Sequence, residues 1–382
     1  MNKYKVCIYA ICKNEEKHIK RWYESMKEAD EIYVLDTGST DNSVNLLKEL
    51  NVHVKIKKYK NFKFDKARND SLNMLPKDTD ICVCTDLDEV FTKGWRKELE
   101  KIWNNKIDRI KYNLNFTFDN YGKPLMTYYI SKIHTRKNYI WTHNIHEVLK
   151  FTLEREENIL INNNIQINHY PDRKKDRSFY LNLLISEVKN NPTDDRDLYY
   201  LGREYMYNKR YNEAIDTLIK QIKISNFIEE KSSSMRFIAI CYKELNRLEE
   251  ALMYLKKSIE ITPNLRESYV LLGVLYYEMK DYSLSVEYLE KASKITNKTL
   301  TYINEEYAWN ETIYDILSLD YFYMGNLTKS LENIDIALKI NPLNKRILKN
   351  KEIIKSLIWF LRTFLWIRYN LQIIKFCDII LL

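Results

Sequence analysis

The sequence predicts an α/β domain with a mostly parallel sheet, followed by an all-α domain of helical repeats. Strand-like and helix-like segments alternate over residues 4–170, and a pattern of small residues and tyrosines repeats after residue 178. Gly and Pro are also rare, at six residues each in 382. This scarcity favours long helices with short connections over a β-sandwich or a collagen-like chain.

The composition narrows the class of protein further. Hydrophobic residues make up 45% and charged residues 30%, which excludes a disordered chain. The net charge of +8 comes from 61 basic and 53 acidic side chains, so the surface should carry both signs. A mildly basic surface suits a phosphate-bearing ligand or an anionic membrane. The basic stretch at 55–68 has no accompanying recognition module, so no nucleic-acid partner is expected.

The cysteines and the N-terminus indicate a cytoplasmic protein. None of the six cysteines has CxxC spacing, and we expect buried, reduced thiols. The apolar run that precedes Lys13 spans only roughly seven positions, too short for a signal peptide.

Short apolar runs alternate with helical segments in the first part of the chain. Strands are expected at 6–12, 32–35, 52–56 and 81–84. Helices are expected at 15–27, between the turn cluster at 36–41 and residue 50, and at 65–75. This order predicts right-handed crossovers and parallel strands, with ligands beyond the carboxyl ends of the strands. Two acidic clusters, 36–41 and 86–89, fall at such ends. The topology therefore points to a site there.

The next segments change character. Residues 110–118 and 125–134 are rich in Tyr, Phe, Ile and Asn around a turn at 120–124, which predicts antiparallel strands. A further strand is expected at 159–169. The α/β domain is therefore expected to close near Pro171 and to occupy residues 1–175.

A repeating pattern follows at 178–350. In each unit a small residue lies three positions before a Tyr, and a second small residue lies nine after it. The four sets are Gly202, Tyr205 and Ala214; Ala239, Tyr242 and Ala251; Gly273, Tyr276 and Ser285; and Ser318, Tyr321 and Ser330. Small residues let paired helices approach closely. The pattern resembles the tetratricopeptide repeat, and a stack of four units would form a concave binding surface.

The C-terminal segment, 351–382, is strongly apolar but interrupted by charged residues, so no spanning helix is expected. Two interpretations stay open. The segment could cap the repeat stack, or it could lie on the inner face of a membrane as an interfacial helix. In the second case its apolar anchors would be Trp359, Phe360, Phe364 and Trp366.

Two carboxylates, Asp86 and Asp88, follow the fourth expected strand. Hard oxygen ligands suit Mg²⁺ or Mn²⁺, which accept substrate phosphates as further ligands. Such an ion would neutralise charge on a departing diphosphate. Taken alone, the triplet is equally typical of solvated loop residues or helix caps.

Asp36 and Arg68 strengthen this pattern. Asp36 ends the second strand, where a carboxylate can bind a base or ribose; the alternative is a helix cap or an Asx turn. Arg68 could reach a nucleotide phosphate or ribose with its planar donors. Its alternative is an ion pair with Asp65 or Asp70.

Four ordered segments, at 11–16, 34–43, 67–69 and 85–89, resemble family 2 glycosyltransferases of the GT-A (Rossmann-like) fold. The resemblance covers residues 4–170 and implies transfer from a nucleotide-diphosphate sugar with inversion. It assigns nucleotide binding to the loop of Cys12, Asn14 and Glu15 and to Asp36, and places Arg68 near the pyrophosphate or base. By the same resemblance Asp88 binds Mn²⁺ or Mg²⁺, and Asp86 contacts ribose or metal. A UDP sugar is the common donor; GDP and dTDP sugars stay open.

Two further segments, 141–148 and 168–170, resemble a branch that includes lipopolysaccharide-core glucosyltransferase-like enzymes and sublancin-type peptide S-glycosyltransferases. The latter also carry helical repeats. By this resemblance Glu147 is the candidate base, His146 is a competing base or an orienting residue, and His169 contacts the metal or phosphate. For each histidine the alternative is a satisfied, partly buried side chain.

The expected activity is therefore hexosyl or N-acetylhexosaminyl transfer. The acceptor would be a peptide or protein held by the repeats, or a glycan or lipid-linked molecule favoured by the apolar tail. Dimerisation through the repeats could coexist with either. A non-catalytic scaffold is the alternative from another class, and the presence of Asp36, Arg68, Asp86 and Asp88 argues against it. A nucleotidyltransferase would need a Gly-rich loop, but no Gly precedes Gly38.

Overall fold

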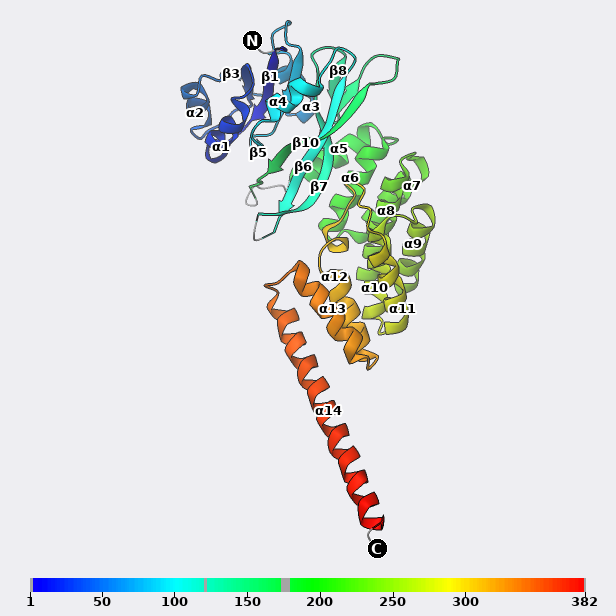
Figure 1. Ribbon diagram of the computed structural model, residues 1–382. Coiled ribbons are helices and arrows are strands. Elements are labelled where there is room, and N and C mark those ends of the chain that lie inside the picture. Colours follow the sequence, from blue (N-terminus) through cyan, green and yellow to red (C-terminus); the bar gives the residue numbers. More distant parts are fainter. Residues whose placement is uncertain (1–2, 120–121, 173–178, 381–382) are drawn as a thin grey trace. The chain divides into compact units, whose positions relative to one another are not determined.

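A computed structural model describes residues 3–119, 122–172 and 179–380, with the side chains of 179 and 364–380 outside the description. The chain forms two compact units (Figure 1). The first is Met1–Ser225 with Thr299–Asn304, and the second is Asn226–Lys298 with Glu305–Leu382.

The first unit is built on an eight-stranded sheet with the order β3-β2-β1-β4-β7-β6-β10-β5. The strands β3, β2, β1 and β4 are parallel, as expected. β7 is antiparallel to β4 and β6, which confirms the predicted hairpin, whereas β10 runs parallel to β6 and antiparallel to β5. The strands are β1 (Val6–Cys12), β2 (Glu31–Asp36), β3 (His53–Ile56), β4 (Ile81–Cys84), β5 (Glu89–Phe91), β6 (Arg109–Phe118), β7 (Pro124–Thr135) and β10 (Ile159–His169).

Helices connect the strands where the apolar pattern predicts them. They are α1 (Glu16–Met26), α2 (Ser43–Glu49) and α3 (Phe64–Leu72). The helix α4 (Trp95–Ile102) and a small second sheet of β8 (Tyr139–Thr142) and β9 (Val148–Phe151) were not expected. Both are short. The helix α4 is nevertheless amphipathic, with Trp95 and Leu99 buried on one face, so its spacing was a signal that the sequence analysis missed.

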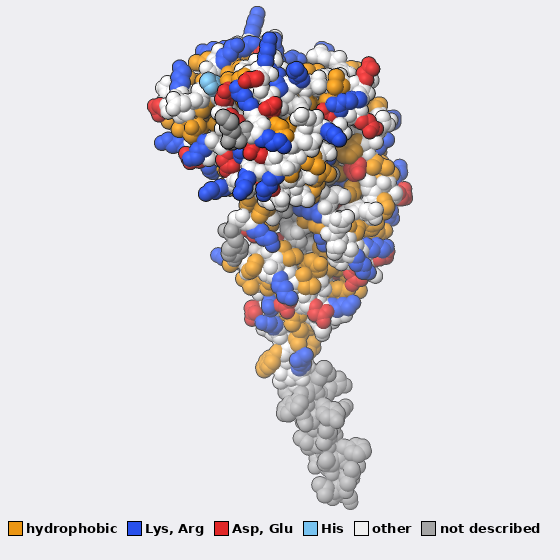
Figure 2. Space-filling model, turned by 45° about the horizontal axis from the view of Figure 1, so that its top comes forward, with side chains coloured by type: hydrophobic (Ala, Val, Ile, Leu, Met, Phe, Trp, Pro, Cys, Tyr) orange, Lys and Arg blue, Asp and Glu red, His pale blue; other side chains and the backbone are white. Residues whose placement is uncertain are grey.

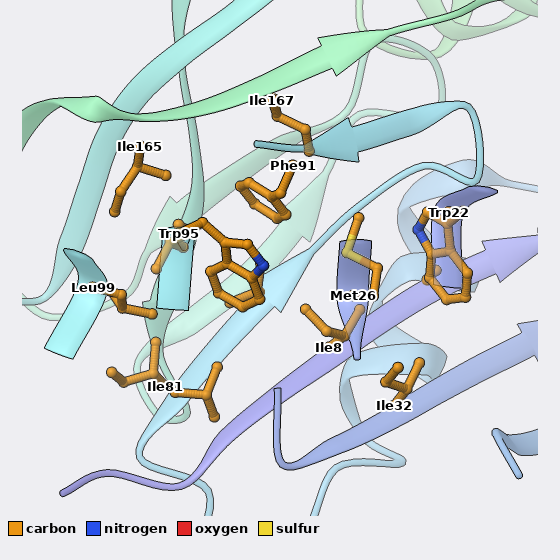
Figure 3. Packing of buried hydrophobic residues seen from close by; sticks show 14 of the residues in the cluster. Ile8, Trp22, Met26, Ile32, Ile81, Phe91, Trp95, Leu99, Ile165 and Ile167 are labelled. Atoms are coloured by element: carbon orange, nitrogen blue, oxygen red, sulfur yellow. The ribbon is translucent and has the colours of Figure 1, made fainter. Parts of the chain in front are cut away.

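Alternate residues of β1 enter two different cores, because successive side chains of a strand point to opposite faces. On one face Ile8 packs with Trp22 and Met26 of α1 and with Trp95 of α4 (Figure 3). On the other face Tyr9 packs with the cysteines of β4 and the aromatic residues of the β8–β9 hairpin. The hairpin therefore forms part of the core beneath the predicted site.

The repeat region consists of helices in close contact. The helices α5 (Phe179–Asn190), α6 (Asp195–Tyr207) and α7 (Tyr211–Ile224) belong to the first unit. The second unit contains α8 (Ile228–Glu244), α9 (Leu248–Ile261), α10 (Arg266–Glu278), α11 (Tyr282–Lys294), α12 (Thr312–Tyr323) and α13 (Leu327–Ile340). A Cβ atom at Gly202 would lie 2.4 Å from Leu218 Cγ, and one at Gly273 would lie 2.5 Å from Leu289 Cγ. The predicted close approach of the helices is thus confirmed.

An insertion separates the last two repeats. Between α11 and α12 the chain enters the first unit over Thr299–Asn304. There the Tyr129 amide of β7 donates a hydrogen bond of 2.9 Å to the Leu300 carbonyl. The 3₁₀ helix Glu306–Ala308 follows in the second unit. This insertion accounts for the longest interval in the repeat pattern.

The last helix, α14 (Lys345–Ile380), packs on α13 over its first turns. Ile347 and Ile354 are buried with Ile334 of α13, as expected for a cap. Beyond them Trp359 is 69% exposed. The expected anchors Phe364 and Trp366 have side chains outside the described residues. Over the part of the chain that was searched, every helix is too short or too polar to span a bilayer.

The thiols and the surface agree with the composition. All five described cysteines, at 7, 12, 82, 84 and 241, are unpaired and buried. Lysine and arginine side chains alternate with acidic ones on the face shown in Figure 2. Such mixing gives a surface of both signs and no extended basic stripe on that face.

Candidate active site

The loops that follow β1 and β2 are joined by side-chain hydrogen bonds. Asn14 Oδ1 accepts from the Thr40 amide at 2.7 Å, and Ser39 Oγ accepts from the Asn14 amide at 2.8 Å. Ser43 Oγ accepts from the Glu15 amide at 2.8 Å. The structure therefore brings the predicted nucleotide-binding residues of both loops to one edge of the sheet, where β1 and β2 run parallel.

Asp36 and Cys12 are buried beneath the loops at this edge of the sheet. Asp36 is 1% exposed, and its Oδ1 accepts from the amides of Gly38 and Ser39, each at 2.9 Å. Its Oδ2 accepts from Ser39 Oγ. Burial raises the pKa of the Cys12 thiol to about 12, and the Asp36 charge adds to the rise, so the thiol stays protonated. Asp36 thus forms an Asx turn, which was the alternative to ligand binding. Both oxygens of its carboxylate accept hydrogen bonds from its own loop.

Arg68 links two acidic groups from distant parts of the chain. It lies on α3 and is 4% exposed. One guanidinium nitrogen forms an ion pair with Asp86, and Nε donates to Glu147 Oε1 at 2.9 Å. The alternative pairing with its helix neighbours is wrong: Asp70 pairs with Lys57 instead. The structure joins Arg68, Asp86 and Glu147 in one group.

Lys132 of β7 belongs to the same group, and the sequence analysis missed it. Its Nζ lies 2.8 Å from Asp86 Oδ2 and 2.9 Å from Glu89 Oε1. Burial raises the pKa of the Asp86 carboxyl, but the charges of Arg68 and Lys132 outweigh burial and hold it well below its usual range. Asp86 is therefore ionised and fully engaged by two cations. The sequence did offer a signal for this residue: Lys132 is a charged side chain within a strand rich in Ile and Tyr.

Asp88 and His169 form a second pair beside this group. Asp88 Oδ2 lies 3.4 Å from His169 Nε2, and the Asp88 carbonyl accepts from the Tyr170 amide at 2.8 Å. The His169 ring stacks on Phe116 with centroids 4.9 Å apart. Its Nδ1 is buried without a hydrogen-bond partner among the described residues. A carboxylate oxygen and an imidazole nitrogen at this separation fit a divalent cation.

A cavity of about 430 Å³ adjoins His169. Its lining combines basic side chains from α1 and the acidic Asp172 with aromatic residues at the end of β6 and after β10. They include Lys17, His18, Arg21, Phe116, Phe118 and Tyr170. The Arg21 guanidinium lies 4.3 Å from the centroid of the Tyr170 ring. Cationic and aromatic groups of this kind suit an anionic or ring-bearing ligand.

His146 is directed away from these groups. Its ring stacks on Tyr200 of α6 with centroids 3.6 Å apart, and its carbonyl accepts from Arg196 Nε at 3.1 Å. His146 has no part in the ion pairs of the two aspartates: Asp86 pairs with Arg68 and Lys132, and Asp88 pairs with His169. Of the two candidate bases, Glu147 is the one that the structure brings to the charged group.

Comparison with known proteins agrees with this geometry. The family model "Glycosyl transferase family 2" matches residues 7–152, and "Tetratricopeptide repeat" matches 237–265 and 267–299. No curated protein matches the chain. The chain thus has an N-terminal family 2 glycosyltransferase domain and C-terminal tetratricopeptide repeats.

Several solved structures resemble the chain over less than half of its length. MamA is 18% identical, over 42% of this chain and 86% of its own, with a TM-score of 0.36. The tetratricopeptide protein TTC0263 of Thermus thermophilus is 18% identical, over 46% and 89%, with a TM-score of 0.35. Pseudomonas aeruginosa pilF is 13% identical, over 45% and 72%, with a TM-score of 0.37. The likeness to sublancin-type enzymes remains a prediction.

Proposed function

We propose that the protein is a metal-dependent, inverting glycosyltransferase that uses a nucleotide-diphosphate sugar, with UDP as the nucleotide. The family match gives the general activity, and the site supports the finer assignment. The observation that carries it is the Arg68 guanidinium, which joins Asp86 to Glu147 next to Asp88 and His169. The charged groups expected for donor, metal and base thus lie within one cluster.

Asp88 and His169 are the residues that would hold Mn²⁺ or Mg²⁺. Asp86 already pairs with Arg68 and Lys132, so Asp88 is the carboxylate of the triplet that remains for a metal. The separation of 3.4 Å between His169 Nε2 and Asp88 Oδ2 supports this set. When bound, the ion would neutralise negative charge on the leaving diphosphate.

Glu147 is the proposed general base. The Arg68 Nε bond to Glu147 Oε1 holds one carboxylate oxygen in a set direction. An ionised carboxylate can accept the proton that the acceptor nucleophile loses during displacement. Attack from the face opposite the diphosphate then inverts the anomeric centre. His146, stacked on Tyr200, would orient the loop instead.

The nucleotide would lie over the loops after β1 and β2. Asn14 and Glu15 stand at this edge through their bonds to Ser39 and Ser43. The carboxylate of Asp36 would act through the turn that it stabilises, because its oxygens already accept from that turn. Backbone groups of the turn would then provide the polar contacts to the base or ribose.

The repeats would bind a peptide or protein acceptor, because helical repeats present extended binding surfaces. A glycan or lipid-linked acceptor is the rival, and the exposed Trp359 on α14 favours it. A binding scaffold without activity would not need the ion pairs that join Arg68 to Asp86 and Glu147. The presence of these pairs therefore argues against a scaffold.

The first test is a thermal-shift panel of UDP, GDP, dTDP and CMP, each with Mn²⁺ or with EDTA. A ligand that binds only the folded state raises the melting temperature. We expect a Mn²⁺-dependent rise with UDP that Asp88→Asn removes. The matched control is Asp78→Asn, because that carboxylate is 73% exposed and lies outside the site. No rise with any nucleotide would contradict the donor assignment and favour the scaffold.

A further inference from the structure

A second cluster of metal-ligating side chains lies outside the group described above. It contains His143, Asp194 and Asp197, whose potential ligand atoms all lie within 4.8 Å of one another. His143 belongs to the loop between β8 and β9, and the two aspartates lie at the start of α6, all within the first unit. Residues from two separate segments of the chain therefore converge on one point.

The ring of His143 is held so that Nε2 faces a carboxylate. Nε2 lies 3.1 Å from Asp194 Oδ2, and Nδ1 lies 3.1 Å from Thr142 Oγ1. The Thr142 hydroxyl donates to the Val148 carbonyl at 3.4 Å, so it can accept the Nδ1 proton. Without a metal, Nε2 can donate its proton to Asp194. In the other tautomer Nδ1 donates to Thr142, and the Nε2 lone pair is then available to a metal, as in metal-bound histidines whose other nitrogen donates to a neighbour.

Asp197 supplies an independent observation that points to a ligand at this place. Its side chain is 4% exposed, yet Oδ1 has no hydrogen-bond partner in the part of the chain that the structure describes. A buried carboxylate oxygen without a partner is unfavourable. Asp194 does not relieve it, because Asp194 Oδ1 accepts from the Asp197 amide at 2.9 Å and adds a second negative charge.

One nearby cation, Arg196, also contacts groups outside the cluster. Arg196 donates through Nε to the His146 carbonyl at 3.1 Å, and its guanidinium lies 5.0 Å from the Tyr200 ring centroid. Glu187 is a further acid whose charge acts on Asp197, and it pairs with Lys63 at 3.1 Å. The local charge therefore favours a bound cation.

We propose that His143, Asp194 and Asp197 bind a divalent transition metal of the zinc class. One imidazole nitrogen with two carboxylate oxygens is a donor set that Zn²⁺ accepts, whereas Mg²⁺ prefers oxygen ligands and retained waters. Tetrahedral Zn²⁺ with bonds of about 2.0–2.1 Å separates its ligand atoms by about 3.3 Å. The His143 Nε2 to Asp194 Oδ2 distance of 3.1 Å matches that spacing.

The metal would fasten the loop that carries the proposed base. His143 and His146 both have a positive backbone φ, at 69° and 54°. Residues other than glycine rarely adopt such angles. Glu147 follows directly and reaches Arg68 at 2.9 Å. A metal joining His143 to α6 would hold this strained loop in place, which makes His143 a positioning residue. The site itself does not depend on the proposed transfer reaction.

The test uses the full chain with Asp88→Asn, which removes the proposed donor-site carboxylate from the measurement. After EDTA treatment and removal of the chelator, ZnCl₂ is titrated by calorimetry, and bound metal is counted after desalting. We expect one Zn²⁺ for each chain. With zinc at ~100-fold above its Kd, the melting temperature should rise by about 5 °C. A chain that retains no zinc would overturn the proposal.

Three variants in that background locate the site. Asp197→Asn and His143→Gln should lose the bound zinc and its rise in melting temperature. Asp195→Asn removes a neighbouring charge on α6 without removing a ligand and should keep both. Metal-free Asp197→Asn should melt no lower than its parent, because the substitution neutralises a buried carboxylate; this separates lost binding from misfolding. An unchanged zinc response in Asp197→Asn and His143→Gln would refute the assignment.

Discussion

At the scale of single residues, the candidate site is a chain of alternating charges. Glu147 pairs with Arg68, Arg68 with Asp86, Asp86 with Lys132, and Lys132 with Glu89. Arg68 and Glu89 are nearly inaccessible to solvent, so each needs its partners to offset the loss of hydration. Removal of one member should therefore affect its neighbours as well as its own contacts.

Lys132→Met tests this dependence. It leaves Glu89 buried without its cation, and breaking a buried pair on one side lowers the free energy of unfolding by about 3–5 kcal/mol. Urea denaturation measures the loss. The double variant Lys132→Met/Glu89→Met should recover part of it, because no acid is then left unpaired at position 89. Equal losses in the single and double variants would show that Glu89 does not need Lys132.

Glu147→Gln tests the base. The amide cannot accept the proton, so kcat should fall by about 10²–10⁴-fold. The Kd of the nucleotide, measured by calorimetry, should change little. The control is Glu154→Gln, an exposed glutamate shortly after β9 in the sequence, and it should retain the parent kcat. A Glu147→Gln enzyme with full kcat would exclude the assigned role.

At the scale of elements, the repeats depend on a few positions where helices meet. Gly273 on α10 faces Leu289 on α11, and the second small residue, Ser285, is fully buried between helices. The period of small residues in the sequence thus marks real helix-to-helix contacts. A side chain added at such a position must displace its neighbour.

A double-mutant cycle on Gly273→Ala and Leu289→Ala measures this contact. Gly273→Ala should lower the free energy of unfolding by about 1–3 kcal/mol through overpacking, partly offset by better helix propensity. Leu289→Ala should cost about 2–5 kcal/mol. The double variant should lose less than the two losses combined, because the small side chain makes room for the added methyl group. Additive losses would mean that the clash is relieved elsewhere.

One helix carries a fully buried acid at a position where the other repeats have Glu204, Cys241 and Leu275. Asp320 of α12 is fully buried, and its Oδ2 accepts from Ser285 Oγ at 2.6 Å. Burial raises the pKa of this carboxyl to about 7, while the bond from Ser285 opposes the rise. The folded second unit therefore favours the protonated acid.

This raised pKa predicts a pH dependence. An unfolded Asp titrates near pH ~4, so between that value and pH ~7 the folded state binds more protons. The free energy of unfolding should therefore fall as pH rises through this range and then level off. Asp320→Asn should flatten the profile and stabilise the protein most at pH ~8, as urea denaturation at several pH values would show. Parallel profiles for parent and variant would contradict the raised pKa.

At the scale of the whole molecule, neither unit is a continuous stretch of sequence. The first unit includes α5–α7 and also the later segment Thr299–Asn304. In that segment the Leu300 carbonyl accepts a hydrogen bond from the Tyr129 amide of the sheet. The predicted repeat region 178–350 thus contributes helices to both units. Helices with repeat-like sequence serve the catalytic unit as well as the proposed acceptor surface.

Two truncations separate the roles of α14. Deleting 345–382 exposes Ile334 of α13, because Ile347 and Ile354 no longer cover it, and should lower the melting temperature. Deleting only 363–382 keeps those contacts and should leave the melting temperature unchanged. Sedimentation with anionic liposomes then decides the open question. Loss of binding in the shorter deletion supports the interfacial interpretation, and no binding by the full chain excludes it.

The sequence by itself determined most of the secondary structure, the parallel half of the sheet and the repeat register, but not α4 or the β8–β9 sheet. These follow from apolar periodicity and small residues at set spacing, which neighbouring residues along the chain establish. Through the family resemblance it also named Arg68, Asp86, Asp88, Glu147 and His169 as candidate site residues, together with Cys12, Asn14, Glu15, Asp36 and His146. Only the tertiary structure decided that Asp36 is occupied by its own turn and that His146 faces Tyr200. It alone paired Lys132 with Asp86 and gathered His143 with Asp194 and Asp197. Such partnerships depend on strand register and on which distant segments meet, and no local pattern encodes them.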